Sequence, residues 1–232
     1  MNEKTLINDT LSLANFLNSC GLPHEIISYA KKMDLDILNL IYEKIINNYD
    51  EKKLDEVTRN ILGVYGNYIA RSYCMSLFKD VDSEVPILDS KGNEITRADI
   101  CFTDNSGLKH YAEVKCASQI IDNIRNYVDA DEQKNYFEDK DNEIIKYKNI
   151  GKKLINQVKK LSTTGCDINV FVYKNCIIDG VIRRKLKELG VNIIRINLDI
   201  NILEDEIKAL LINIKNKSNN YDIHLNSKIK SL

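Results

Sequence analysis

Two short runs in which apolar and polar residues alternate constrain the fold of this chain more than any other feature. They are ITRADICFT at residues 95–103 and HYAEVKCA at residues 110–117, and the link DNSGLK between them has turn composition. Alternation with a period of two is typical of half-buried strands, so the stretch predicts a β-hairpin. Asp99, Glu113 and Lys115 stand out in these strands, because charged side chains are costly to bury unless they are paired.

Side chains two residues apart on a strand share a face of the sheet. Glu113 therefore shares a face with Lys115, and Asp99 shares one with Arg97. If the hairpin pairs Asp99 with Glu113, two carboxylates and one ammonium meet on one side of the sheet. Carboxylates on neighbouring strands form a hard oxygen site of the kind that Mg²⁺ binds. A lysine beside them can orient a water molecule and offset phosphate charge.

The E-x-K pattern by itself is weak evidence for a catalytic site. The pattern E-x-K occurs five times, starting at Glu51, Glu113, Glu132, Glu138 and Glu206. Only Glu113 lies in an apolar strand that follows another apolar strand carrying an aspartate. The alternative interpretation is a surface salt bridge between Lys115 and a carboxylate on an exposed sheet face.

The order of the predicted elements indicates the fold class. From residue 53 on, the patterns predict a helix (53–78), strands at 84–88, 95–103 and 110–117, a helix at 144–161, a strand at 167–173, a helix at 179–190, a strand at 191–198 and a last helix. We therefore expect an α/β fold with a mixed central β-sheet flanked by helices. Residues 3–50 carry only helical patterns. The predicted domains are an all-helical N-terminal extension over 1–52 and a sheet domain over 53–232.

Within the helix at 53–78, Gly63, Gly66 and Ala70 form a patch of small residues. Glycine in a helix costs about 1 kcal/mol relative to alanine. The patch therefore predicts close packing of the helix backbone on another element.

Composition excludes some classes of protein. Apolar residues make up 44% and charged residues 29% of the 232 residues, and the net charge is −1, which is typical of a soluble globular chain with no overall basic signature. We see no apolar run of bilayer-spanning length and no signal-peptide pattern, so we expect a cytoplasmic protein without a membrane partner. The six cysteines form no C-x-x-C pair, which favours buried free thiols over disulfides or zinc.

With these residues identified, the sequence resembles the PD-(D/E)XK nuclease superfamily over about residues 53–198. The resemblance implies a restriction-endonuclease-like core, in which Asp99 is the first acid, Glu113 the second and Lys115 the catalytic lysine. It also implies a Mg²⁺ (or Mn²⁺) ion held by Asp99, Glu113 and the carbonyl of Val114. Ala98 stands where the name of the superfamily has proline.

Three further residues follow from the same resemblance. Gln157 lies on the helix at 144–161, where some members place an active-site glutamine; a helix-surface amide is the alternative. The stretch GVYGNYIA at 63–70 resembles the G-x-x-G-E-x-x-A helix of resolvase-like and bacterial toxin members, with Asn67 in place of the glutamate that approaches the metal. Glu84, on the first strand, is the better candidate for a third acid.

Basic residues near the predicted site are candidates for phosphate contacts. The helix at 144–161 holds six lysines and no acid. The candidates for nucleic-acid binding are Arg97, Lys152, Lys153 and Lys160, and solvated surface lysines are the alternative for most of that helix. The acidic run at 129–143 is either a solvated surface or a mimic of a polyanion.

The expected function is that of a metal-dependent endonuclease that hydrolyses phosphodiester bonds, with DNA preferred over RNA. Restriction or defence, repair, and an antibacterial toxin with a cognate inhibitor remain open as settings. The alternatives are an RNA-cleaving (tRNA) toxin, a non-catalytic nuclease-fold module and an inhibitor that mimics nucleic acid. The helical N-terminus is the expected surface for an inhibitor or partner protein, and a homodimer is also open.

Overall fold

A computed structural model describes residues 10–120 and 150–219 of the chain. These residues fall into two compact units. The first comprises residues up to Tyr68 and from Asn201 on, and the second comprises Ile69–Ile200. The predicted division between residues 52 and 53 stays a prediction, and the helix that starts beside it contributes to both units.

The first unit is helical. Its elements are α1 (Thr10–Ser19), α2 (His24–Lys32), α3 (Ile37–Ile41), the π-helical turn η1 (Tyr42–Ile46), α4 (Glu51–Leu77) as far as Tyr68, and α7 (Ile200–Ser218) from Asn201 on. Asp36 caps α3, because its carboxylate accepts a hydrogen bond from the amide of Asn39 at 3.0 Å. The described N-terminal segment is thus helical, as predicted.

The helix α7 packs with the N-terminal helices of the first unit. The ammonium of Lys215 donates to the carbonyl of Ile46 at 2.8 Å, and that of Lys208 lies 3.2 Å from the carboxylate of Asp55. Leu211 and Ile214 are fully buried. The predicted helical extension is therefore completed by a helix from the other end of the described chain.

The second unit contains a mixed five-stranded sheet in the order β1-β2-β3-β5-β7. Strands β1 to β3 are antiparallel, whereas β3, β5 and β7 are parallel. A short parallel pair, β4 with β6, forms a second sheet. The strands are β1 (Lys79–Leu88), β2 (Glu94–Thr103), β3 (Lys109–Lys115), β4 (Gln119–Ile120), β5 (Asp167–Tyr173), β6 (Ile177–Ile178) and β7 (Asn192–Ile196).

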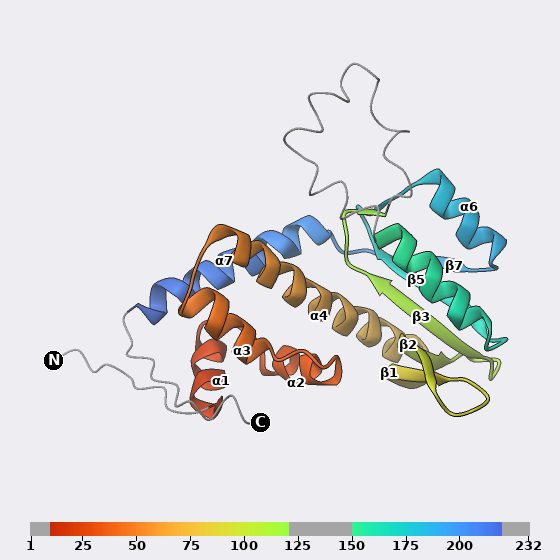
Figure 1. Cartoon of the computed structure of the whole chain (residues 1–232), viewed down its shortest axis with the longest axis horizontal. Coiled ribbons are helices and arrows are strands. Elements are labelled where there is room, and N and C mark those ends of the chain that lie inside the picture. The colour runs from red at the N-terminus through yellow and green to blue at the C-terminus, as the bar shows by residue number, and fades with distance from the viewer. Residues whose placement is uncertain (1–9, 121–149, 220–232) are drawn as a thin grey trace, which may run out of the picture. The chain divides into compact units, whose positions relative to one another are not determined.

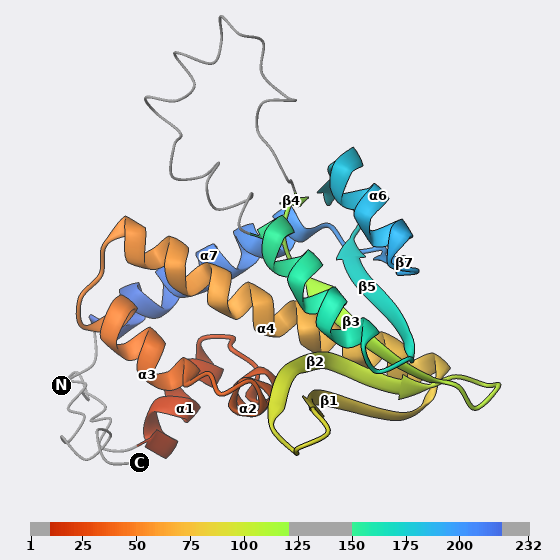
Figure 2. The ribbon, with the colours of Figure 1, turned by 45° about the vertical axis from the view of Figure 1, so that its right-hand side comes forward.

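Helices flank this sheet, which confirms the predicted α/β class. The helix over 150–162 lies across β3 and β5 in both views (Figures 1 and 2). Its residues Leu154 and Val158 share an apolar core with Val170 and with α6 (Gly180–Glu188). On the opposite face, the ring of Tyr73 in α4 meets Phe171 edge to face, with 6.1 Å between centroids. Successive side chains of β5 point to opposite faces of the sheet, so this strand contributes to the apolar core on each face.

The β1–β2 and β2–β3 connections are built in the same way. In each turn the first aspartate, Asp89 or Asp104, accepts hydrogen bonds through its Oδ1 atom from backbone amides two and four residues later, at 2.8 to 2.9 Å. The fourth residue is a glycine with φ of +84° or +86°. The sequences DSKGN and DNSGL therefore specify one turn conformation, which only glycine adopts easily at that position.

Two local predictions were wrong. Strand β1 begins at Lys79 rather than residue 84, although residues 79–83 lack apolar alternation. Among the described strands it lies at the edge of the sheet and pairs with β2 alone, so these residues need no second apolar face. Close packing at Gly63 was also predicted, but a methyl group there would meet no described atom within 4 Å outside its own helix turn and neighbours.

Candidate functional site

The pairing of β2 with β3 brings Asp99 and Glu113 together. The register matches Ile100 with Ala112, and the next step outward places Asp99 opposite Glu113. Lys115, two residues further along β3, lies on the same face as Glu113. The face is the one that the helix over 150–162 covers, since Tyr111 on that side of β3 belongs to the core built around that helix.

The three charged groups are in contact. The Nζ atom of Lys115 lies 2.9 Å from Oε2 of Glu113 and 4.0 Å from Oδ2 of Asp99. The same Oδ2 atom accepts a hydrogen bond from the backbone amide of Val114 at 2.6 Å. Strand pairing and side-chain contacts thus bring the predicted trio together, and their catalytic roles remain a prediction.

Burial differs sharply within the trio. The side chain of Glu113 is 0% exposed, whereas those of Asp99 and Lys115 keep 18% and 17% of their surface exposed. The Oε1 atom of Glu113 is buried with no hydrogen-bond partner among the described residues. The site is therefore reached from solvent past Asp99 and Lys115, with Glu113 beneath them.

Burial raises the pKa of the Glu113 carboxyl to about 7; Lys115 opposes this shift, and the negative charges of Asp99 and Glu84 add to it. Burial alone would lower the pKa of Lys115, but the carboxylates of Asp99 and Glu113 outweigh it, so that pKa is raised. The trio holds two acidic groups against one ammonium, so negative charge is in excess when both acids are ionised.

Glu84 belongs to the same row of side chains. The register that pairs Ser83 with Ile100 and Val85 with Ala98 leaves Glu84 opposite Asp99. Its backbone has a φ of +56°, in the left-handed region that non-glycine residues rarely adopt. Together with its effect on the pKa of Glu113, this places a third carboxylate on β1 near the trio.

The trio offers suitable donors for a hard cation. Carboxylate oxygens are preferred ligands of Mg²⁺, and the buried Oε1 of Glu113 has no hydrogen bond that a cation would displace. The carbonyl of Val114 points to the same strand edge as its amide, toward Asp99, because both groups of a strand residue face one neighbour. Within residues 10–120 and 150–219, however, no three His, Cys, Asp or Glu side chains are grouped closely enough to hold a metal ion as they stand.

Gln157 and Asn67 lie in different units. Gln157 is half-buried on the helix over 150–162, which packs on the face of the sheet that carries Glu113. Asn67 belongs to the helical unit, where its side chain is almost fully buried and its Nδ2 atom lies 3.8 Å from Sδ of Met33. Its Oδ1 atom has no hydrogen-bond partner among the described residues. A role for either residue in the site stays a prediction.

Of the predicted nucleic-acid contacts, Arg97 forms an ion pair with Glu94, with guanidinium-to-carboxylate distances of 3.2 and 3.3 Å. Lys152, Lys153 and Lys160 are exposed on the helix over 150–162. The acidic run at 129–143 lies outside the described residues. The prediction overlooked α6, although its sequence RRKLK carries four basic residues in five.

A half-buried cysteine, Cys116, follows the trio directly. Burial raises the pKa of the Cys116 thiol to about 12, so the reactive thiolate is scarce at neutral pH. All six cysteines fall within the described residues and are free thiols.

No protein-family model matches the sequence, and a comparison with curated proteins finds no match. The nuclease resemblance therefore depends on the chain's own residues. None of the helices in the described parts of the chain combines the length and the apolar character that a membrane span needs.

Proposed function

We propose that the chain is a metal-dependent endonuclease that hydrolyses phosphodiester bonds, with DNA as the preferred substrate. The observation that carries this proposal is the contact of Lys115 with the fully buried Glu113 at 2.9 Å, opposite Asp99. A salt bridge on an exposed sheet face, the alternative interpretation, does not explain a carboxylate with no exposed surface.

The energetics of the trio support a functional role. Burying charge is expensive unless every group is paired and hydrogen-bonded. An unsatisfied buried acceptor costs about 1–3 kcal/mol, and Oε1 of Glu113 is such an atom among the described residues. A divalent cation would offset both the excess negative charge and this cost.

Asp99, Glu113 and the carbonyl of Val114 are the groups that would hold the ion. When bound, Mg²⁺ or Mn²⁺ supplies charge neutralisation at the phosphodiester and lowers the pKa of a bound water. Lys115 keeps 17% of its side chain exposed beside both carboxylates. In the proposed mechanism its ammonium orients the attacking water and offsets the charge of the scissile phosphate.

A digestion assay on plasmid DNA and total RNA, with Mg²⁺ or Mn²⁺ and with EDTA as a control, tests the proposal. Lys115→Ala should abolish metal-dependent cleavage. Lys109→Ala, which removes a lysine from the other end of β3, should leave it unchanged. Cleavage of RNA alone would overturn the preference for DNA and favour a tRNA-cleaving toxin.

A second candidate is a non-catalytic module that binds nucleic acid or a protein. It is favoured by the lack of a ready three-ligand group in the described residues and by Asn67 in place of the toxin-type glutamate. A folded protein that cuts neither polymer would establish this candidate instead. Calorimetric titration with Mn²⁺ adds a direct measure, because binding lost in Glu113→Gln supports the enzyme.

The biological setting follows from the resemblance alone. We propose action in the bacterial cytoplasm, of the producing or of a target cell, in restriction, in defence or as an antibacterial toxin. A cognate inhibitor or partner would bind the N-terminal helices. Gel filtration tests the alternative of a homodimer.

A further inference from the structure

Two neighbouring helices of the second unit concentrate positive charge. The helix over 150–162 and α6 together carry eight basic side chains and one acidic one, Glu188, whereas the whole chain has a net charge of −1. All of these side chains are exposed except Lys185, which is half-buried. Such a local excess attracts polyanions even when the total charge is near zero.

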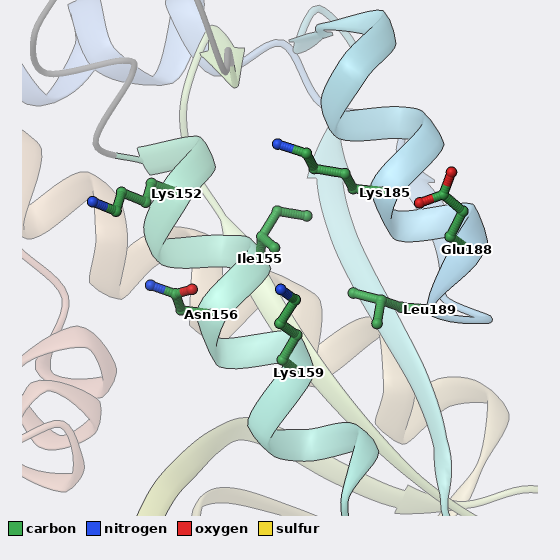
Figure 3. Close-up of a pocket in the computed structure, with 7 residues that line it drawn as sticks. All are labelled: Lys152, Ile155, Asn156, Lys159, Lys185, Glu188 and Leu189. Atoms are coloured by element: carbon green, nitrogen blue, oxygen red, sulfur yellow. The ribbon is translucent and has the colours of Figure 1, made fainter.

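The two helices enclose a groove of about 510 Å³. Its cationic lining residues are Lys152 and Lys159 from one helix and Lys185 from the other. Figure 3 shows Lys185 reaching from α6 toward the other helix and Lys159 extending along that helix toward Ile155, whereas Lys152 and Asn156 point away from α6. Asn156, Glu188 and Leu189 complete the lining, so the groove combines the ammonium groups of Lys159 and Lys185 with one carboxylate and a short apolar floor.

The kind of cation indicates what is recognised. Lysine acts as a point charge toward phosphate, whereas bidentate reading of base edges is typical of arginine. The seven described lining residues include no arginine and no aromatic ring. Stacking on aromatic rings is the usual way to hold the bases of single strands. The groove is therefore suited to phosphates and poorly suited to bases.

We propose that this groove binds the phosphate backbone of double-stranded nucleic acid, independently of its sequence, through Lys159 and Lys185. The proposal rests on the proposed nuclease function and deepens it by naming the form of the substrate. It adds Lys159 and Lys185 to the contacts predicted from the sequence.

The test is equilibrium binding of a fluorescent duplex DNA in EDTA, measured by anisotropy over a series of salt concentrations. Each phosphate contact contributes about 0.9 to the slope of log affinity against log salt for B-DNA. Lys159→Ala/Lys185→Ala should therefore reduce the slope by about 2 and weaken binding at least tenfold at low salt. Two duplexes of unrelated sequence should bind alike, and a single strand of equal length should bind less tightly.

The control is Lys91→Ala/Lys174→Ala, which removes two exposed lysines of the same unit outside both helices. It should leave the slope unchanged. Equal losses in both double variants, tighter binding of the single strand, or no nucleic-acid binding by the natural chain would each overturn the proposal. The last result would point to an acidic protein as the partner.

Because the assay contains no metal, it separates this proposal from catalysis. If the natural chain cleaves with metal and Lys159→Ala/Lys185→Ala binds the duplex as tightly as the natural chain, the groove proposal fails and the nuclease proposal stands. Groove-dependent binding without cleavage under any metal would overturn the nuclease and leave the groove as part of a binding module.

Discussion

Strand β3 carries a polar cluster at each end, and the two clusters differ in how completely their hydrogen bonds are satisfied. At the start of the strand, Nε2 of His110 lies 3.1 Å from a carboxylate oxygen of Asp104, and its Nδ1 lies 3.2 Å from the amide of Asn169. The imidazole also stacks on Phe102, with centroids 4.9 Å apart. At the end of the strand, Glu113 keeps a buried oxygen without a partner among the described residues.

The difference separates a structural role from a functional one. An Asp–His contact also occurs in catalytic pairs, but here both ring nitrogens of His110 already have a partner, Asn169 at Nδ1 and Asp104 at Nε2, so neither is available to a substrate. The cluster around His110 stabilises a turn. The trio around Glu113 pays a desolvation cost with one oxygen unsatisfied, which is typical of a site that binds a ligand.

The largest expected effect is on stability at the trio. Lys115→Met should lower the free energy of unfolding by about 3–5 kcal/mol, because it leaves a buried carboxylate without its counter-charge. Glu113→Gln/Lys115→Met should recover most of this loss, since neither group is then charged. Urea unfolding measures both. The control Lys91→Met, in an exposed turn, should change stability by less than about 0.5 kcal/mol. A similarly small effect of Lys115→Met would contradict a buried ion pair.

At the other end of β3, His110→Ala should cost about 2 kcal/mol of stability, because it removes the stack on Phe102 and two hydrogen bonds. Cleavage per folded molecule should not change. Thermal unfolding and the digestion assay check the two parts. His24→Ala, at an exposed histidine, is the control for stability. Loss of cleavage by a folded His110→Ala variant would show that the His110 cluster has a functional role, as is proposed for the trio.

The sequence alone predicted that Asp99, Glu113 and Lys115 lie together. Once two strands are identified, a side-chain period of two decides which residues share a face, and the turn DNSGL fixes the register. Asp99, Glu113 and Lys115 then meet without any knowledge of the rest of the fold.

Long-range packing could not be predicted in this way. The docking of α7 with the N-terminal helices depends on contacts such as Lys215 with Ile46, far apart in the chain. The groove depends on two helices that β5 and β6 separate in the sequence. The left-handed backbone of Glu84 has no local signal either, because such a conformation at a non-glycine residue depends on its surroundings.

Glu84 tests how far the functional cluster extends across the sheet. Glu84→Gln should reduce metal-dependent cleavage about tenfold, equivalent to about 1.4 kcal/mol in the barrier, because it removes a negative charge opposite Asp99. Asp82→Asn, an exposed acid on the same edge strand, should have no effect on rates. If the two variants behave alike, the site ends at β2 and the strained backbone of Glu84 is a feature of the edge strand alone.

The smallest expected effect is a pH dependence at the His110 cluster. Hydrogen bonds from the Ser106 hydroxyl, the Leu108 amide and His110 hold the pKa of Asp104 below its ordinary value of 3.8. Since the pKa is lowered by folding, the stabilisation is present above about pH 4 and is lost as the pH falls through the folded-state value. The difference in melting temperature between the natural chain and Asp104→Asn should therefore shrink between about pH 5 and about pH 2.

Asp89→Asn is the matched control for that measurement, because Asp89 occupies the same position in the other turn and its pKa is also lowered, by Asn93, without a histidine. The acid-dependent difference should be smaller for Asp89→Asn than for Asp104→Asn, since only Asp104 also accepts from an imidazole. Equal profiles would mean that the hydrogen bond from His110 adds nothing to the acid dependence of the turn. The cluster would then be held by stacking and neutral hydrogen bonds, and the charged trio at the other end of β3 would differ from it even more.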